Sequence, residues 1–324
     1  MSDAPGDLRQ AYDVAIVGGG PAGLSAGMWS ARYLHRAVVI DSGDPRNWET
    51  RGINGFLGLP GITPAELRGR GRDECRAYGA TLIDATVLAI APQDDEAFVL
   101  SLSGGRRLES RRLLLAYGLR DVWPEIPGLT RVYGANAHVC PDCDGYEARG
   151  KKVVVIGSGR RAAGMALNLT TWTDRIIVCT NGMPPELDDE YCEKLDALNI
   201  PVLTERVRRV CYAGSLIISL ELENDMQLDA DKIFFSLAQY PSDDLGALLH
   251  CDRDEGGHII VDEHLRTSVE HVYAAGDLIP GAQLAIAAAA DGAIAAMAMH
   301  KSLVPMTRRL APLIPEDEPL NANT

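Results

Sequence analysis

Two glycine-rich turns of the same kind constrain the fold of this chain more than any other feature. The first begins at Gly18 and the second at Gly157, and each follows a short apolar run and precedes a segment of small residues. A strand, a glycine turn and a helix in this order form a unit that binds the pyrophosphate of a dinucleotide, because N–H groups at the start of the helix point at the phosphates. Two such units predict two nucleotide-binding folds, or one such fold and a degenerate copy.

The first unit carries the complete dinucleotide fingerprint. The apolar run 13–17 predicts a strand, the turn reads Gly-Gly-Gly-Pro-Ala-Gly at 18–23, and small residues at 24–33 predict a helix. A second strand is predicted at 37–40, and Asp41 follows it. An acidic residue about 20 positions after the glycines is placed to bind a ribose hydroxyl. The sequence therefore predicts a dinucleotide site at this turn.

The second unit repeats this order in the middle of the chain. Strands are predicted at 152–156 and 175–179, with the turn Gly-Ser-Gly-Arg-Arg-Ala at 157–162 and a helix at 163–172 between them. Nearer the end, an apolar run leads into Gly276-Asp277, whose carboxylate is suited to bind a ribityl or ribose hydroxyl. The fold class that we predict is α/β, with two Rossmann-like domains.

Composition excludes several classes of protein. Apolar residues make up 46% of the 324 residues, a normal share for a globular protein, which excludes a disordered or collagen-like chain. The net charge of −14 disfavours nucleic acid as a partner, because a phosphate backbone calls for a basic face. No secretory signal is visible, and segment 278–299 is rich in small residues and contains Asp291, so we expect no membrane span. Five cysteines are scattered singly, as in a reducing cytoplasm.

The other two cysteines form a pair, Cys140 and Cys143, in the run Cys-Pro-Asp-Cys-Asp-Gly. A zinc half-site, two structural thiols and a redox dithiol are three interpretations of this spacing. Zinc would need a second pair, and the chain has no other Cys-x-x-Cys. The neighbouring dinucleotide units favour the redox dithiol. Asp144 could give a proton to a departing thiolate, or it could serve only as a turn residue before Gly145.

These motifs together resemble those of the low-molecular-weight thioredoxin reductases. The resemblance covers about residues 10–302 and rests on four motifs in the family's order: GGGPAG (18–23), CPDCDG (140–145), GSGRRA (157–162) and AAGDLIPGAQLA (274–285). It implies an FAD-binding domain formed by 1–122 and 247–324. It implies a smaller NAD(P)-binding-like domain, inserted into the first at 123–246, that carries the dithiol. A homodimer whose domains rotate is implied as well.

The resemblance also implies a role for each site residue. Cys143 would face the flavin, Cys140 would attack the disulfide of thioredoxin or another dithiol partner, and Asp144 would be the catalytic acid. No metal is implied. The positions that correspond to FAD-binding positions of the family are Gly18, Gly20, Pro21, Ala22, Gly23, Asp41, Asn54, Gly276, Asp277, Gln283, Leu284 and Ala285.

The chain departs from the family on the nicotinamide side. Members that use NADPH have a His-Arg-Arg cluster after the second strand of the inserted domain, whereas this chain has Cys-Thr-Asn-Gly at 179–182. That run also lacks the acidic residue that would bind the ribose of NADH. Further positions also differ from the family: Tyr117, Arg160, Arg161, Ala238, and the run Gln283-Leu284-Ala285, where the family has Arg-Gln-Ala. NADPH as a cofactor is therefore in doubt, whereas FAD is expected.

Four functions are compatible with these observations. We predict an FAD-dependent reductase of thioredoxin whose electron donor is not NADPH, for example a ferredoxin. The alternatives are an ordinary NADPH-dependent thioredoxin reductase, a dithiol oxidase that forms disulfides in a small molecule with oxygen as acceptor, and a flavin-bound redox sensor. Relative potentials decide between reductase and oxidase.

Two groups of arginines and the tail each have two interpretations. The arginines could dock an acidic ferredoxin, or they could be ordinary solvated charges. The Pro-rich tail 303–324 could be a flexible end, or it could cover the flavin or reach across a dimer. The arginines are Arg68, Arg70, Arg72 and Arg76 in the first group and Arg106, Arg107, Arg111 and Arg112 in the second.

Overall fold

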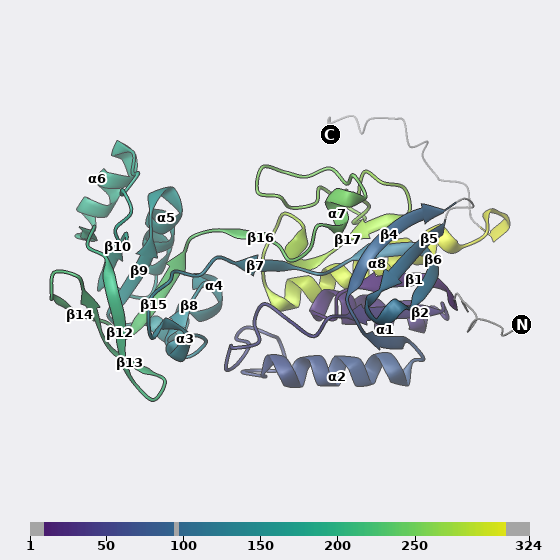
Figure 1. Cartoon of the computed structure of the whole chain (residues 1–324), viewed down its shortest axis with the longest axis horizontal. Helices are drawn as coiled ribbons and strands as arrows, with labels where there is room; N and C mark the ends of the chain where they lie inside the picture. The colour runs from purple at the N-terminus through teal and green to yellow at the C-terminus, as the bar shows by residue number, and fades with distance from the viewer. Residues whose placement is uncertain (1–9, 94–96, 309–324) are drawn as a thin grey trace, which may run out of the picture.

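The computed structural model describes residues 10–93 and 97–308, which form two α/β parts joined by a pair of extended segments (Figure 1). Residues 309–324, which hold most of the Pro-rich tail, lie outside the described residues.

The first part is built on a seven-stranded sheet in the order β3-β2-β1-β6-β5-β4, with β17 also paired to β6. β1, β2, β3, β6 and β17 run parallel, whereas β4, β5 and β6 pair antiparallel. All five residues of β2 are buried, as expected for a parallel strand that is covered on both faces. The strands are β1 (Gln10–Val17), β2 (Ala37–Asp41), β3 (Thr81–Asp84), β4 (Val87–Gln93), β5 (Ala97–Leu102), β6 (Arg107–Leu115) and β17 (Val272–Ala274).

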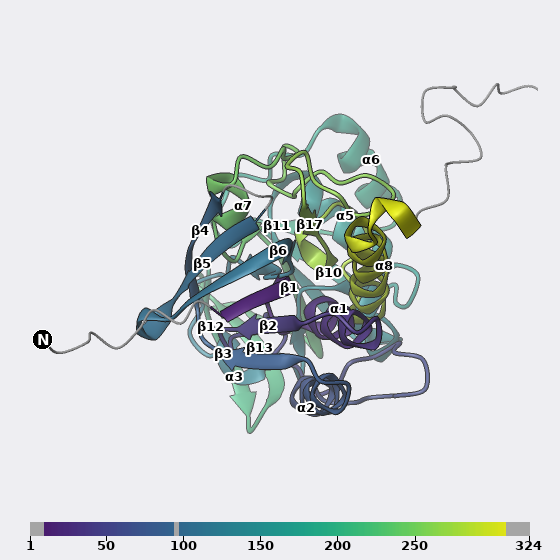
Figure 2. The same ribbon diagram turned by 90° about the vertical axis from the view of Figure 1, so that its right-hand side faces the viewer.

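Three helices accompany this sheet: α1 (Pro21–Arg32), α2 (Pro64–Ala77) and α8 (Ala285–Leu303). Figure 2 shows α1 and α8 side by side. The two backbones approach so closely that a Cβ on Gly292 would lie 2.0 Å from the carbonyl oxygen of Ala22. The small residues of segment 278–299 therefore serve helix packing. Within the two described ranges, no helix has the length and apolar character that crossing a bilayer requires.

Two short strands connect the two parts. β7 (Leu119–Asp121) leads out of the first part and β16 (Gln239–Pro241) leads back, and they pair antiparallel with Gln239 opposite Asp121 (Figure 1).

The second part is built on a five-stranded parallel sheet in the order β11-β10-β9-β15-β8. A three-stranded antiparallel sheet, β12-β13-β14, adjoins it. Phe234 and Phe235 are both buried and belong to separate apolar clusters, because successive residues of a strand point to opposite faces. The strands are β8 (Ala137–His138), β9 (Val153–Gly157), β10 (Ile176–Cys179), β11 (Val202–Leu203), β12 (Val207–Ala213), β13 (Leu216–Leu222), β14 (Gln227–Asp229) and β15 (Lys232–Ser236).

The remaining helices are short apart from α5. They are α3 (Leu129–Val132), α4 (Pro141–Asp144), α5 (Gly159–Leu169), α6 (Asp189–Ala197) and α7 (Leu245–Leu248). The predicted α/β class with two Rossmann-like units is confirmed. The helices after the glycine turns begin earlier than predicted, at Pro21 and Gly159, because each turn runs directly into the first helical turn.

Candidate active site

A cavity of about 850 Å³ lies where the first sheet meets the dithiol segment, and it is large enough for a cofactor. It brings together almost all the predicted site residues. Gly23 is the exception, because it lies behind the turn, where a Cβ would come within 1.9 Å of the carbonyl oxygen of Gly18. The predicted residues on the cavity wall are Gly18, Gly20, Pro21, Ala22, Asp41, Asn54, Cys140, Cys143, Asp144, Gly276, Asp277, Gln283, Leu284 and Ala285.

The first glycine turn forms one end of the cavity. Gly18 has φ +114°, and a Cβ there would lie 2.2 Å from the carbonyl oxygen of Ala116, so only glycine fits without strain. A Cβ on Gly20 would meet nothing within 4 Å. Gly20 precedes the first turn of α1, whose N–H groups favour an anion. The open space beside Gly20 therefore fits the pyrophosphate of FAD.

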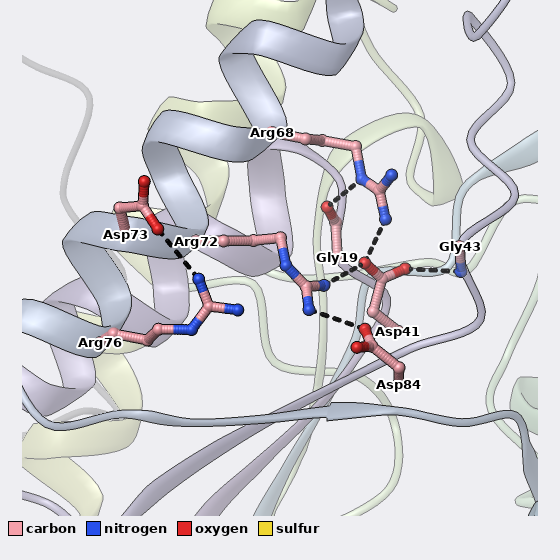
Figure 3. Close-up of polar contacts among 8 residues, drawn as sticks. All are labelled: Gly19, Asp41, Gly43, Arg68, Arg72, Asp73, Arg76 and Asp84. Carbon is pink, nitrogen blue, oxygen red and sulfur yellow. Dashed lines mark hydrogen bonds and ion pairs between the residues drawn. The ribbon is translucent and has the colours of Figure 1, made fainter.

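Asp41 ends β2 and is held by two arginines of α2 (Figure 3). Its Oδ2 accepts hydrogen bonds from Arg68 and, at 3.0 Å, from Arg72 Nη1. The backbone N–H of Gly43 donates to Oδ1 at 3.0 Å, and Arg72 also binds Asp84 at 2.7 Å. Asp41 thus lies at the predicted ribose position as a carboxylate with partners on both oxygens.

This geometry fits the interpretation as solvated charges for the five exposed arginines, Arg70, Arg76, Arg106, Arg107 and Arg111, and contradicts it for Arg68, Arg72 and Arg112. Arg68 and Arg72 are mostly buried against Asp41 and are neither solvated nor presented to a partner. Arg112 is 3% exposed and donates to Ser302 Oγ at 2.7 Å. Arg70 and Arg76 are exposed but pair with acidic residues of their own helix. Arg68 and Arg72 lie close together because both bind Asp41, an arrangement that charge counting along the chain does not reveal.

A second cluster, centred on Arg46, stands at the other predicted FAD contacts. Arg46 donates to Asp277 Oδ2 at 3.0 Å and to Gln283 Oε1 at 2.9 Å. It also forms a two-pronged pair with Asp121 of β7, at 2.6 and 2.7 Å. Burial lowers the pKa of Arg46, but the hydrogen bonds and charges of Asp121 and Asp277 together outweigh it, so the net shift is upward. Gln283 continues the network to Gln239 of β16 at 3.1 Å, so the cavity is tied to both connecting strands.

The dithiol lies on the wall of the same cavity as the glycine turn. Cys140 and Cys143 are joined by a disulfide, with Cα atoms 5.3 Å apart, at the one-turn helix α4. Pro141 opens this helix, and the N–H of Cys143 donates to Cys140 Sγ at 3.1 Å. A disulfide that shares a cavity with a dinucleotide turn can exchange electrons with a cofactor bound there.

Asp144 has partners that the sequence did not indicate. His138 Nδ1 lies 3.3 Å from its Oδ1, and Asn54 Nδ2 donates to the same oxygen at 3.5 Å. His138, Arg46 and Arg68 all line the cavity, and sequence reasoning assigned none of them to the site. A lone histidine two residues before Cys140 was the one local signal available for His138.

The second glycine turn is in contact with its own chain. Gly159 N donates to the carbonyl oxygen of Pro185 at 2.8 Å. Ser158 Oγ donates to the carbonyl oxygens of Pro184 and Pro185. The loop that carries these carbonyls also contains Asp188, whose carboxylate pairs with Arg160 at 3.2 Å. At the start of α5, the N–H group of Gly159 and the hydroxyl of Ser158 therefore bind backbone carbonyls of this loop.

The comparisons with known proteins agree with this geometry. A family model described as pyridine nucleotide-disulphide oxidoreductase matches residues 12–292. A thioredoxin reductase of Treponema pallidum (strain Nichols) is 30% identical over 298 residues, which cover 89% of this chain and 95% of that protein. The crystal structure of HlmI is 33% identical with a TM-score of 0.86, over 91% of this chain and 93% of that one. A putative thioredoxin reductase, TrxB, from Bacillus anthracis is 27% identical with a TM-score of 0.83, over 90% and 98%.

Proposed function

Because the chain belongs to the pyridine nucleotide-disulphide oxidoreductases and is of the thioredoxin reductase type, we propose that its Cys140–Cys143 disulfide takes electrons from bound FAD and passes them to thioredoxin, and that the donor to the flavin is not NADPH. Membership of this family makes the chain a flavoprotein oxidoreductase. Bound FAD supplies a two-electron carrier. The residues that would hold it are the first glycine turn, Asp41 and the pair Gly276-Asp277.

One observation carries the proposal about the donor: the hydrogen bond from Gly159 N to Pro185 O. In a dinucleotide site this region of the helix start receives the pyrophosphate. Carbonyl oxygens there present partial negative charge, and the carboxylate of Asp188 holds the guanidinium of Arg160 in an ion pair instead of leaving it free for a phosphate. A phosphate would have to displace the loop, or it would meet the partial negative charge of these carbonyl oxygens. The lack of a basic cluster at 179–182 supports the same conclusion.

The chain's own residues account for the thiol chemistry. Once the disulfide is reduced, Cys140, at the start of α4, attacks the partner's disulfide, and Cys143 then attacks Cys140 to release the partner. Asp144, one residue after Cys143, moves the proton between thiol and leaving thiolate. The Arg46 network joins the proposed flavin site to both connecting strands. A rotation of the two parts about these strands would therefore change the hydrogen bonds at that site.

The test is an anaerobic titration of the yellow holoprotein with NADPH, then NADH, then dithionite, followed by the visible flavin absorbance. We expect no bleaching by either nicotinamide and full bleaching by dithionite. The reduced protein is then mixed with oxidised thioredoxin, and the thiols formed are counted. Transfer of two thiols per thioredoxin is the expected result, and a Cys140→Ser, Cys143→Ser double variant should reduce none.

Rapid bleaching by NADPH would contradict the proposal about the donor. It would leave an ordinary NADPH-dependent enzyme whose loop at Pro185 moves aside. Failure to reduce thioredoxin, together with disulfide formation in a small dithiol under oxygen, would replace the reductase by a dithiol oxidase.

The finer features of the enzyme are proposals as well. We propose that residues 1–122 and 247–324 form the FAD-binding domain, that 123–246 form the inserted domain, and that the enzyme is a cytoplasmic homodimer. A ferredoxin is the donor that we would test first. Arg68 and Arg72 give no support for its docking, because they are buried against Asp41.

A further inference from the structure

A chain of three polar side chains runs from the dithiol helix into the second part. Asp144 Oδ1 lies 3.3 Å from His138 Nδ1, and His138 Nε2 lies 3.1 Å from Lys232 Nζ. Lys232 Nζ also donates to the carbonyl oxygen of Ala135 at 2.9 Å. β8 and β15 pair in parallel, with His138 opposite Phe234, and so fix the histidine and the lysine next to each other.

The hydrogen-bonding capacities of these groups determine which ring nitrogen of His138 carries the proton. A lysine ammonium group only donates, so His138 Nε2 must accept from Lys232 and carry no proton. The imidazole proton is then on Nδ1, which donates to the Asp144 carboxylate. The positive charge of Lys232 is therefore linked to the negative charge of Asp144 through one imidazole.

Burial strengthens this link. His138 is 5% exposed and Lys232 is 8% exposed, so water screens the attraction between Lys232 and Asp144 poorly. Burial lowers the pKa of Lys232 and exceeds the opposing effects of Asp144 and Glu147. The other titratable or charged groups that face Asp144 or Lys232 are Tyr133, Arg51 and Lys151. Among the groups facing Lys232, Asp144 makes the largest opposing electrostatic contribution.

We propose that His138 and Lys232 are positioning residues for Asp144, holding its carboxylate oriented and its charge compensated so that it takes the proton of a reacting thiol. This inference rests on the proposed dithiol exchange. In that exchange the S–H bond of Cys140 breaks, its proton moves to Asp144, and Sγ bonds to one sulfur of the partner. The partner's S–S bond breaks, and its leaving thiolate takes the proton from Asp144. Cys143 then forms the S–S bond to Cys140, and its proton goes to the second leaving thiolate.

The electrons and protons balance in this sequence. The two cysteines together lose two electrons and two protons, and the partner's disulfide gains both. Without Lys232 and His138, the carboxylate of Asp144 would stand uncompensated beside the dithiol. An uncompensated negative charge disfavours a thiolate nearby and therefore raises the pH at which the thiol reacts.

The test measures thiol reactivity directly and requires neither the electron donor of the flavin nor thioredoxin. The holoprotein is reduced with a phosphine, and iodoacetamide labelling of Cys140 and Cys143 is followed by mass spectrometry across a pH series. The exposed Cys192 serves as the internal reference. For Lys232→Met and His138→Leu we expect the reactivity profile to move to higher pH. The labelling rate at neutral pH should fall about tenfold for each pH unit by which the profile moves.

Two control variants separate positioning from a general structural effect. His138→Gln can still accept from Lys232 and donate to Asp144, so it should restore most of the wild-type profile. Lys194→Met removes an exposed lysine that pairs with Glu190 of its own helix, away from these three side chains, and should leave the profile in place. Retention of FAD shows that each variant is folded.

Two outcomes would overturn the proposal. One is a Lys232→Met or His138→Leu profile that coincides with the wild type. The other is an equal displacement of the profile in Lys194→Met. Neither outcome depends on whether thioredoxin is the partner, so a failure here is distinguishable from a failure of the proposed function.

Discussion

Arg46 Nη1 donates to Asp277 Oδ2 at 3.0 Å while the same guanidinium holds Asp121 with its other two nitrogens. One side chain thus joins a predicted flavin contact to the strand that leaves the first part. Arg46 is 17% exposed and Asp121 is 6% exposed, so the pair is largely desolvated.

Removing Arg46 should therefore be costly. Because a buried carboxylate left without its partner is strongly unfavourable, Arg46→Met should lower the free energy of unfolding by about 3–5 kcal/mol. Urea denaturation measures this. The matched control is Arg120→Met, which breaks an exposed pair with Asp44 and should cost about 0–1 kcal/mol. Equal costs would show that the Arg46 cluster adds nothing to stability.

Asp41→Asn should weaken FAD binding. Loss of a charged acceptor at the ribose position costs about 1.5–3 kcal/mol, which is roughly a 10- to 150-fold rise in the dissociation constant. Titration of the apoprotein with FAD, followed by flavin fluorescence, measures it. Asp84→Asn is the control, because Asp84 shares Arg72 but is 79% exposed. If both variants lose the same affinity, Asp41 does not contact the cofactor.

Two alanine substitutions in one turn should have different effects. Gly18→Ala forces a left-handed backbone and a contact with Ala116, so the free energy of unfolding should fall by at least about 1–3 kcal/mol. Gly20→Ala meets no protein atom and should cost less than about 1 kcal/mol. Its methyl group should nevertheless lower FAD affinity, because it fills the proposed phosphate space. Unfolding curves of the apoproteins and FAD titrations give the two readouts. Wild-type FAD affinity in Gly20→Ala would show that the phosphate does not lie at this turn.

The pH dependence of stability should carry a signature of Asp291. Burial in α8 raises the pKa of Asp291, while a hydrogen bond from the backbone of Gly276 opposes the shift and Asp277 adds to it. A raised folded-state pKa means that the protonated form favours folding. This contribution is fully present below the unfolded value of about 4 and is lost as pH rises through the folded pKa.

Asp291→Asn should therefore gain stability relative to the wild type as pH rises through that window, because asparagine stays neutral and can still accept from Gly276. Thermal melts from acid to neutral pH measure the difference. The exposed Asp174→Asn is the control and should not reproduce the trend. A constant difference between Asp291→Asn and the wild type at all pH values would contradict the prediction.

The features that could be predicted from the sequence are those that depend on residues close together in the chain. The order of strand, glycine turn and helix depends on neighbouring residues, and the need for glycine at Gly18 comes from one close contact with the adjacent strand end. The predicted helix starts lie too late in the chain, because a glycine turn does not mark where helical backbone begins. The polar networks could not be predicted. Arg46 and Asp277 are 231 positions apart, and His138 and Lys232 are 94 apart, so only the folded topology brings them together.

The hydrogen bond between Gly159 and Pro185 has a pharmacological consequence. Inhibitors that mimic the adenosine diphosphate end of NADPH depend on free N–H groups at the start of the helix. If the donor is not NADPH, as we propose, such compounds would meet the carbonyl oxygen of Pro185 on this protein, and those selected against NADPH-dependent reductases should have little potency here. A selective ligand would instead have to bind in the cavity that the disulfide and Arg46 both line. Arginine and aspartate side chains there can form ion pairs and hydrogen bonds with it.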